Sequence, residues 1–468
     1  MSAHALFVPP RPATPAAPLP FFAFLRALRA NALSMWPEAA YEQDVIRRRL
    51  LSGTNLLINA PEVIRHILVD NAENYRRTHA SIRILHPITG NGLLLSTGEA
   101  WRHQRRTIAP ALAPRMLPLL TRHIVTATEA TIADLRTLID QPVDLLAAMQ
   151  SLALDIAGRS MFSLETRHYG APIRAMLTEY AGHARPTLLD ILLPASIMAP
   201  RDLGRRRFHR RWMALIDSIM QTRMAAPATE TPRDLFDLLR AARDPETGTA
   251  FSHDELRDQI ATMILAGHET TAVALFWALT LLAAAPDAQH RIAVEAADLD
   301  LSAEHATEAL PQLPFTRAVL SETLRLYPPA FVIVRQAIAA DQCDGIDIPR
   351  GAVAMMAPWV LHRHHKLWRD PDAFDPSRFL PDAPPPPRFA YLPFGTGPRV
   401  CVGAQFALTE ATLALAALTR TFHIAREDAT PVLPVAIVTT QPDHAPPFRL
   451  RLRSMPDTQQ SGDQGPHP

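Results

Sequence analysis

The sequence predicts a mainly α-helical fold with small β-sheets near both ends of the chain. Between residues 99 and 285, apolar side chains recur at the spacing of successive helices. Short runs of β-branched residues separated by turn signals occur instead at 55–59 and across 330–358. About half of the 468 residues are hydrophobic, so the chain has enough apolar surface for a large core.

The two ends of the chain carry different signals. Residues 1–20 are rich in proline, which predicts an extended arm. Residues 21–33 are apolar but are interrupted by charged side chains, and a membrane span would need about 20 apolar residues. Residues 454–468 lack apolar periodicity, which predicts a disordered tail.

Individual helices are predicted from this periodicity and from proline positions. A helix at 61–71 follows the strand-like run, and three more are expected at 117–139, 142–162 and 206–224. A helix at 314–327 would be ended by Pro328 and Pro329. The last helix is expected at 404–418, followed by a short β tail through Leu452.

The longest predicted helix begins at Ser252 and is ended by Pro286. Ser252 and Glu255 have the spacing of a capping box. Its centre, Ala266-Gly267-His268-Glu269-Thr270-Thr271, puts a glycine, a carboxylate and two threonines into an apolar run. The glycine alone costs about 1 kcal/mol relative to alanine, and an unpaired buried carboxylate costs more. This pattern indicates a functional site, a local distortion that opens a groove beside an acid and an alcohol. A harmless kink is one alternative. A membrane helix is the other, but the uninterrupted apolar run at 272–285 is too short to span a membrane.

Composition argues against several classes of function. The formal net charge is +1, so no bulk electrostatic attraction to nucleic acid is expected. Only two cysteines occur, Cys343 and Cys401, which argues against a disulfide framework and fits a reducing cytosol. No secretory signal or membrane anchor is recognisable, so we expect a cytoplasmic protein.

Cys401 lies in the glycine-rich loop Phe394-Gly395-Thr396-Gly397-Pro398-Arg399-Val400-Cys401-Val402-Gly403. Backbone N–H groups of such a loop and of the following helix would favour a thiolate. The glycines would let the backbone approach a flat partner, and Arg399 offers a cation for an anionic one. A thiolate in these surroundings suits the axial position of a haem iron. A buried structural cysteine and a reactive nucleophile are the alternatives.

Several segments resemble motifs of the cytochrome P-450 family and occur in the family's order over residues 101–403. The loop at 394–403 resembles the haem-binding signature, and 266–271 resembles the oxygen-activation motif. Glu322-Thr323-Leu324-Arg325 and the segment 374–379 resemble two further motifs, with Ser377 in place of the usual acid. The resemblance implies the cytochrome P-450 fold, with 21–453 as a single domain.

The resemblance also implies roles for individual residues. Cys401 would bind the iron of haem b, Thr270 would hydrogen-bond the oxygen on that iron, and Glu269 would relay protons from solvent. The other implied cofactor-binding residues are Trp101, Arg105, Ala266, Gly267, Arg335, Phe394, Arg399 and Gly403. Among them, Trp101 and the three arginines would bind the propionates. Glu322, Arg325 and Arg378 would form a buried network that holds the Cys401 loop.

The implied reaction is a monooxygenation. One atom of O2 would enter a hydrophobic small molecule, and the other would become water. No flavin or iron–sulfur segment is present, so a separate ferredoxin- or flavodoxin-type electron donor is implied, docking near Arg102, Arg105 and Arg106. By analogy the pocket would be lined by residues 81–92, Met263, Ala266, residues 330–334 and Thr439-Thr440. We expect a monomer without a membrane span or a nucleic-acid partner.

Other functions stay open at this point. A haem-thiolate isomerase, dehydratase or peroxygenase is one, although the acid–alcohol pair favours oxygen activation. A non-catalytic haem sensor or carrier is another. A metal site at His362-Arg363-His364-His365 is a third, but this spacing fits no common zinc pattern. The substrate could be a fatty acid, a terpenoid, a steroid-like molecule or an aromatic compound.

Overall fold

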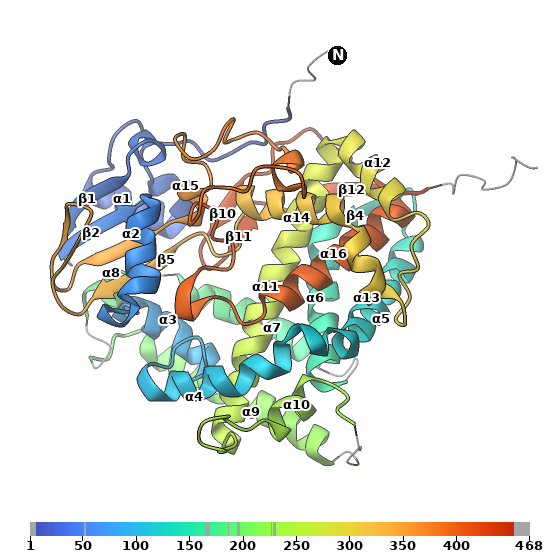
Figure 1. Ribbon diagram of the computed structural model, residues 1–468, viewed down its shortest axis with the longest axis horizontal. Coiled ribbons are helices and arrows are strands. Elements are labelled where there is room, and N and C mark those ends of the chain that lie inside the picture. The colour runs from blue at the N-terminus through green and yellow to red at the C-terminus, as the bar shows by residue number, and fades with distance from the viewer. Residues whose placement is uncertain are drawn as a thin grey trace, which may run out of the picture.

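A computed structural model describes residues 6–50, 53–163, 169–185, 187–193, 197–225, 227 and 231–453 (Figure 1). The segment 454–468, for which the sequence predicts disorder, lies outside the described residues. Most of the described structure is helical, and small sheets occur near both ends of the chain. The predicted fold class, mainly α with small β-sheets, is therefore confirmed.

The α-helices account for most of the chain, with short 3-10 segments mainly before Leu117 and after Ala309. Their bounds are α1 (Phe21–Ala30), α2 (Pro61–Arg65), α3 (His79–Thr89), α4 (Gly98–Ile108), α5 (Leu117–Arg136), α6 (Leu145–Phe162), α7 (Gly170–Ala184), α8 (Leu188–Leu192), α9 (Asp202–Ala225), α10 (Leu235–Ala241), α11 (His253–Ala284), α12 (Pro286–Glu295), α13 (Ala306–Ala309), α14 (Pro314–Leu326), α15 (Pro358–Leu361) and α16 (Ala404–Thr421).

The strands join segments that are far apart in sequence. Their bounds are β1 (Val45–Leu50), β2 (Gly53–Ile58), β3 (Tyr75–Arg76), β4 (Pro142–Asp144), β5 (Ile333–Ala337), β6 (Asp341–Cys343), β7 (Ile346–Ile348), β8 (Val353–Met356), β9 (Phe422–Arg426), β10 (Pro434–Ala436), β11 (Thr440–Pro442) and β12 (Pro447–Leu452). The largest sheet has the order β1-β2-β8-β5-β3, in which β2 and β8 are parallel. The other sheets are β4-β12-β9 and the hairpins β10-β11 and β6-β7.

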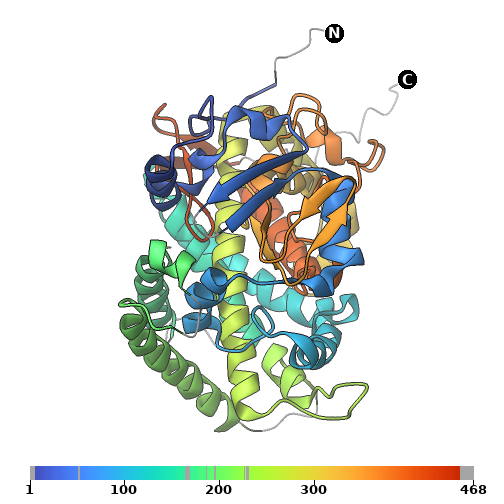
Figure 2. The ribbon, with the colours of Figure 1, turned by 90° about the vertical axis from the view of Figure 1, so that its left-hand side faces the viewer.

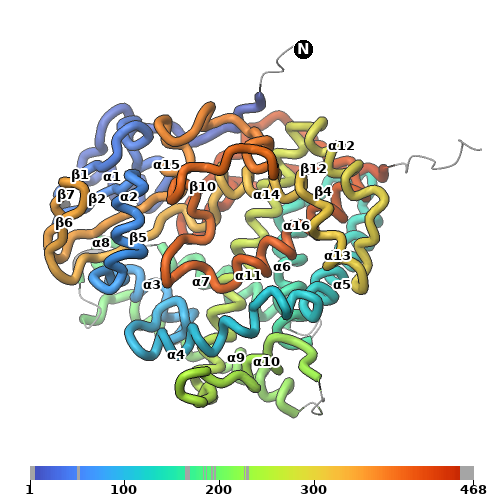
Figure 3. Tube along the Cα trace, viewed as in Figure 1, coloured from blue at the N-terminus to red at the C-terminus, as the bar shows by residue number. Residues whose placement is uncertain are grey.

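Helix α11 passes through the molecule and joins two hydrophobic cores. Its residues from Val273 onward pack with α5, α14 and α16, whereas Leu256, Ile260 and Ile264 pack with α9 and α10. Figure 2 shows α11 in yellow-green over almost the whole height of the view. In the Cα trace, α16 lies beside α11 (Figure 3). The capping box is formed: the Ser252 hydroxyl accepts from Glu255 N, and the Glu255 carboxylate accepts from Ser252 N.

The length argument against a membrane-spanning α11 is not sufficient by itself. Among the described residues, α11 is the one helix that is long and apolar enough to cross a membrane. However, 72% of its most apolar 18-residue window is buried inside the protein. Burial by the protein core therefore explains its apolar composition.

Some predicted helix boundaries are wrong for local reasons. The helix expected at 142–162 begins only at Leu145, because residues 142–144 form β4 and pair with β12. The Asp144 carboxylate accepts from Ala147 N at 2.9 Å and so caps α6. The helix expected at 61–71 ends as an α-helix at Arg65, and residues 66–70 continue it as a π-helix.

The proline-rich segment contacts the body of the protein. Residues 6–20 contain no helix or strand. Phe7 O accepts a hydrogen bond from Phe374 N (2.8 Å), and the Arg11 guanidinium lies 3.3 Å from the Asp372 carboxylate. These contacts bring the segment to the loop that follows α15.

Candidate active site

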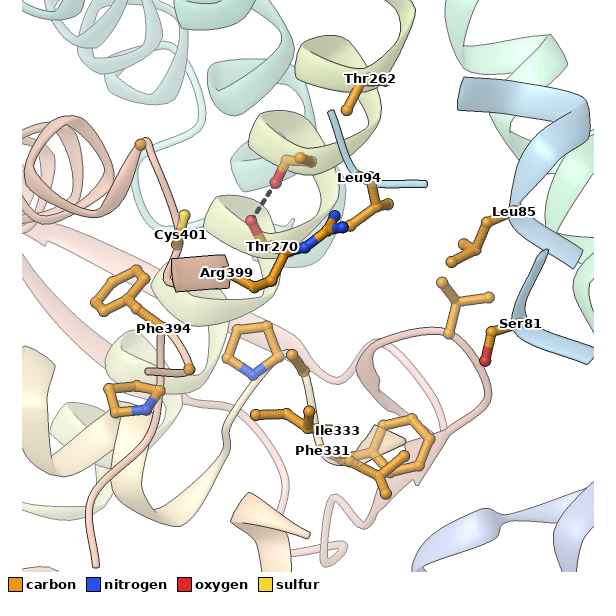
Figure 4. Close-up of a pocket in the computed structure, with 18 of the residues that line it drawn as sticks. Ser81, Leu85, Leu94, Thr262, Thr270, Phe331, Ile333, Phe394, Arg399 and Cys401 are labelled. Carbon is orange, nitrogen blue, oxygen red and sulfur yellow. Dashed lines mark hydrogen bonds between the residues drawn. The ribbon is translucent and has the colours of Figure 1, made fainter. Parts of the chain in front are cut away.

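A cavity of about 900 Å³ lies against α11. In Figure 4, Cys401 and Thr270 lie toward one end of the view, and Ser81 and Leu85 lie toward the other. Most of the predicted site residues line this cavity: Trp101, Arg105, Ala266, Gly267, Thr270, Arg335, Phe394, Arg399, Cys401 and Gly403. Glu269 is not among the lining residues.

The loop before α16 holds Cys401 with its side chain open to the cavity. Cys401 N donates to Phe394 O at 2.9 Å, which closes the loop on itself. Gly397 has a φ of +72°, and a Cβ atom there would collide with the backbone of Leu68. Burial raises the pKa of the Cys401 thiol, and the Gly403 N–H and the Arg105 cation lower it in part. The loop therefore supplies part of the stabilisation that a thiolate needs, and a bound metal cation would supply more.

A cluster of arginines lies on the same side of the cavity as the Cys401 loop. Arg399 lies over the ring of Trp101, 4.3 Å from its centroid, and Arg105 donates to Val400 O at 2.9 Å. Burial and the neighbouring cations Arg335 and Arg105 lower the pKa of Arg399 to about 10. Burial also lowers the pKa of Arg335.

Two further basic residues, Arg77 and His79, line the cavity and were missed by sequence reasoning. Burial, with Arg335 and Arg399 nearby, lowers the pKa of Arg77 to about 9. Arg77 Nε, His79 Nδ1 and Arg399 Nη1 are buried and have no hydrogen-bond partner within the described part of the chain. The one signal in the sequence was a pair of basic residues directly before the predicted pocket loop.

These arginines fit a ligand that carries two negative charges. Buried cations are costly unless they are paired, and here the described residues offer Arg77, Arg335 and Arg399 no carboxylate. Guanidinium groups bind carboxylates through charge-assisted hydrogen bonds. The two propionates of a haem placed over Cys401 would supply such carboxylates.

Helix α11 contributes small residues and a hydroxyl to the cavity. Thr270 Oγ1 donates to Ala266 O at 2.5 Å, one turn earlier. A Cβ atom added to Gly267 would meet open space. No π or 3-10 turn marks the predicted distortion, because α11 is α-helical without a break from His253 to Ala284. The room beside it comes from the small side chains of Ala266 and Gly267.

Glu322, Arg325 and Arg378 lie together, with the first two fully buried. Arg325 Nε and Nη2 donate to the two oxygens of Glu322 at 2.7 and 2.8 Å. Arg378 Nε lies 3.5 Å from Glu322 Oε1, and Asp375 N donates to the same oxygen at 2.8 Å. Arg325 also donates to the carbonyls of residues 362, 371 and 373. The pair therefore ties α14 to the segment that leads toward the Cys401 loop.

A family model described as cytochrome P450 matches residues 12–444 of the chain. The chain belongs to the cytochrome P450 family. Cyclooctatin synthase of Streptomyces melanosporofaciens is 34% identical over 80% of this chain and 82% of its own length. Cyclooctat-9-en-7-ol 5-monooxygenase of the same organism is 30% identical over 86% of both chains. Pentalenene oxygenase of Streptomyces avermitilis is 30% identical over 88% and 90%.

Solved structures give the same fold for this cytochrome P450. The crystal structure of a cytochrome P450 (CYP102L1) superposes with a TM-score of 0.81, over 95% of this chain and all of the other. The crystal structure of the P450DA heme domain superposes with a TM-score of 0.80, over 96% of this chain and 99% of the other. Because the sequence identities are only 23% and 22%, these structures are similar to the chain in fold alone. With relatives named as monooxygenases, the chain is a P450 monooxygenase, an oxidoreductase.

The lining of this P450 cavity corrects part of the predicted substrate pocket. Residues from 81–92 and 330–334 do line the cavity, as do Met263 and Ala266. Thr439 and Thr440 do not, and their neighbours Ile437 and Val438 take that place. The Thr440 hydroxyl donates instead to Pro328 O at 2.6 Å.

The histidine segment of this P450 serves packing. In the described residues no group of three histidine, cysteine or acidic side chains is placed to hold a metal ion. His362 Nε2 accepts from Leu392 N at 2.8 Å, and its Nδ1 lies 3.2 Å from Arg325 O. Burial lowers the pKa of His362 to about 3, so the ring is neutral and links the Glu322–Arg325 network to Leu392, just before the Cys401 loop.

The arginines of α4 do not form the free cationic surface that we expected for a redox partner. Arg102 pairs with Glu73 at 2.7 Å and with Glu99 at 3.3 Å. Arg106 pairs with the buried Asp244 at 2.8 Å, and also with Glu99 and Glu246. The Arg105 side chain lines the cavity. Their charges are therefore already engaged within the protein.

Proposed function

We propose that this P450 inserts one oxygen atom from O2 into a hydrophobic small molecule, with Cys401 as the thiolate ligand of haem b. One observation carries this proposal: Cys401 and a cluster of arginines without carboxylate partners line the same cavity. Electrons would come from a separate ferredoxin- or flavodoxin-type donor. We also propose a monomer that works in the cytoplasm.

The protein's own residues would hold and shield the cofactor. Arg77, Arg335 and Arg399 would bind the propionates, and Gly395 would let the loop approach the ring. When bound, haem supplies the activation of O2, and thiolate ligation favours cleavage of the O–O bond. The chain contributes binding, orientation and exclusion of water. Thr270 would hold a hydroxyl at the cavity wall, and Glu269 would pass protons from solvent.

The apolar side chains that line the cavity support a hydrocarbon-like substrate. Leu85, Leu94, Phe331 and Ile333 point into it in Figure 4, and Val438 also lines it. Two relatives are named for cyclooctat-9-en-7-ol and for pentalenene, names of an unsaturated alcohol and an unsaturated hydrocarbon. Among the substrate classes left open by the sequence, we therefore propose a terpenoid hydrocarbon or its alcohol.

Isotope incorporation tests this proposal directly. The haem-loaded protein, NADPH, a ferredoxin and its reductase are incubated with labelled O2 and a panel that includes pentalenene and long-chain fatty acids. We expect one labelled oxygen atom in a terpenoid product and none in the fatty acids. Product formed with hydrogen peroxide, together with no labelled product from O2 and NADPH, would contradict this proposal and favour a peroxygenase.

A further inference from the structure

Glu269 and Thr270 are neighbours in sequence, but their side chains have different surroundings. Successive side chains on an α-helix diverge by about 100°. Thr270 lines the cavity, whereas Glu269 lies against the hairpin of β10 and β11. Thr439 Oγ1 donates to Glu269 Oε1 at 2.7 Å, and Gln441 Nε2 donates to the same oxygen at 2.9 Å.

The three side chains form a closed polar group. Gln441 Nε2 also lies 3.1 Å from Thr439 Oγ1, and Thr439 is only 5% exposed. Both donors bind Oε1, and none of the described residues forms a hydrogen bond with Oε2. Glu269 is half-buried, so part of its side chain is open to solvent while Oε1 is held.

The hairpin itself is fixed on one side and reaches the cavity on the other. Trp277 Nε1 donates to Thr440 O at 2.8 Å, and the Thr440 hydroxyl donates to Pro328 O. These bonds attach the hairpin to α11 and to the segment after α14. Directly before Thr439, Ile437 and Val438 line the cavity. The same short segment therefore touches both the acid and the space for the substrate.

We propose that Thr439 and Gln441 are positioning residues for Glu269, holding its carboxylate for proton transfer toward the Thr270 side of α11. This inference rests on the proposed function. In each transfer, Glu269 Oε2 would take a proton from solvent and give it to a water molecule on the Thr270 side of α11, so that the carboxylate charge is restored. The hydrogen bonds at Oε1 keep the carboxylate from turning away into solvent.

The test measures proton transfer without any organic substrate. O2 consumption by the haem-loaded full chain, driven by NADPH, a ferredoxin and its reductase, is compared in H2O and D2O. We expect Thr439→Val/Gln441→Leu to lower the rate about tenfold and to raise the solvent isotope effect. Glu269→Gln should likewise lower the rate and raise the solvent isotope effect. Thr439→Ser, which keeps a hydroxyl, should stay within about twofold of the wild type.

A double-mutant comparison separates positioning from a general loss of structure. If the hairpin acts through Glu269, adding both hairpin substitutions to Glu269→Gln changes the rate by less than about twofold. Thr280→Val is the matched control, because its hydroxyl binds Phe276 O on α11 and touches neither Glu269 nor the hairpin. It should keep the wild-type isotope effect.

Two results would overturn the inference. One is a wild-type isotope effect in Thr439→Val, Gln441→Leu and their combination. The other is that the hairpin substitutions lower the rate by the same factor in Glu269→Gln as in the wild type. The carbon-monoxide difference spectrum of each variant checks that its haem site is intact. A wild-type chain that binds haem but consumes no O2 would instead contradict the proposed function.

Discussion

Arg77 is a half-buried cation with a buried Nε, and the charged groups that act on its pKa are also cations. Arg335 and Arg399 both act to lower its pKa, and its Nε has no hydrogen-bond partner in the described part of the chain. Such a group costs stability in the protein alone and is satisfied only by an anion. No motif identified it, because one arginine before a helix has no distinctive spacing. Arg335, Arg399 and Cys401 could be named from their motifs, since those motifs fix their positions along the chain.

Arg77→Met is expected to weaken haem binding about tenfold or more, because a charge-assisted hydrogen bond to a propionate is lost. The same change should leave the haem-free protein as stable as before, or more stable, because the uncompensated buried charge is removed. Haem titration followed by Soret absorbance and urea unfolding of the haem-free protein measure the two effects. Arg76→Met is the matched control, since Arg76 binds the Gln336 side chain at the surface. Equal losses of haem affinity in both variants would argue against a propionate contact.

At the scale of elements, the sequence predicted helices well where periodicity was long and capped. The capping box at Ser252 and Pro286 placed the two ends of α11, and Pro314 placed the start of α14. The three-residue strand β4 was missed, because its pairing with β12 joins segments about 300 residues apart. The contact of Glu269 with Thr439 was missed for the same reason. Register between distant segments is not encoded in local spacing.

Glu322→Gln should lower the free energy of unfolding by about 3–5 kcal/mol. It leaves Arg325 buried without its ionic partner between α14 and the segment 371–375. Urea unfolding of the haem-loaded protein measures the change. Glu308→Gln, an exposed change on α13, is the control and should shift the free energy by less than about 0.5 kcal/mol. A loss of similar size in both variants would contradict a buried ionic role.

Glu410 on α16 faces Thr271 on α11, which is its hydrogen-bond partner. Burial raises the pKa of Glu410 from 4.5 to about 8. Because the folded-state pKa is the higher one, its stabilising contribution is complete below pH 4.5 and is lost as pH rises through 8. In the wild type the free energy of unfolding should therefore fall as pH rises from 4.5 to about 8. Glu410→Gln should remove most of that fall, a difference of a few kcal/mol at about pH 8. An unchanged pH profile, measured by urea unfolding, would show that Glu410 titrates normally.

At the scale of the whole molecule, long-range contacts bring the motifs to one cavity. The largest sheet pairs β2 with β8, so the N-terminal strands support β5 and its Arg335. α11 crosses both cores and carries Ala266, Gly267 and Thr270 past the loop of Cys401. The sequence predicted this meeting only through the resemblance to a family, because composition and periodicity place helices but not their neighbours. The single domain proposed for 21–453 stays a prediction.

The reduced, carbon-monoxide-bound spectrum tests the central claim most directly, that Cys401 holds a haem iron as a thiolate. The haem-loaded wild-type protein and Cys343→Ala should both show the red-shifted Soret band of thiolate ligation. Cys401→Ala should lose that band. The spectrum of a histidine-bound haem in the wild type, or a red-shifted band that survives in Cys401→Ala, would contradict the account.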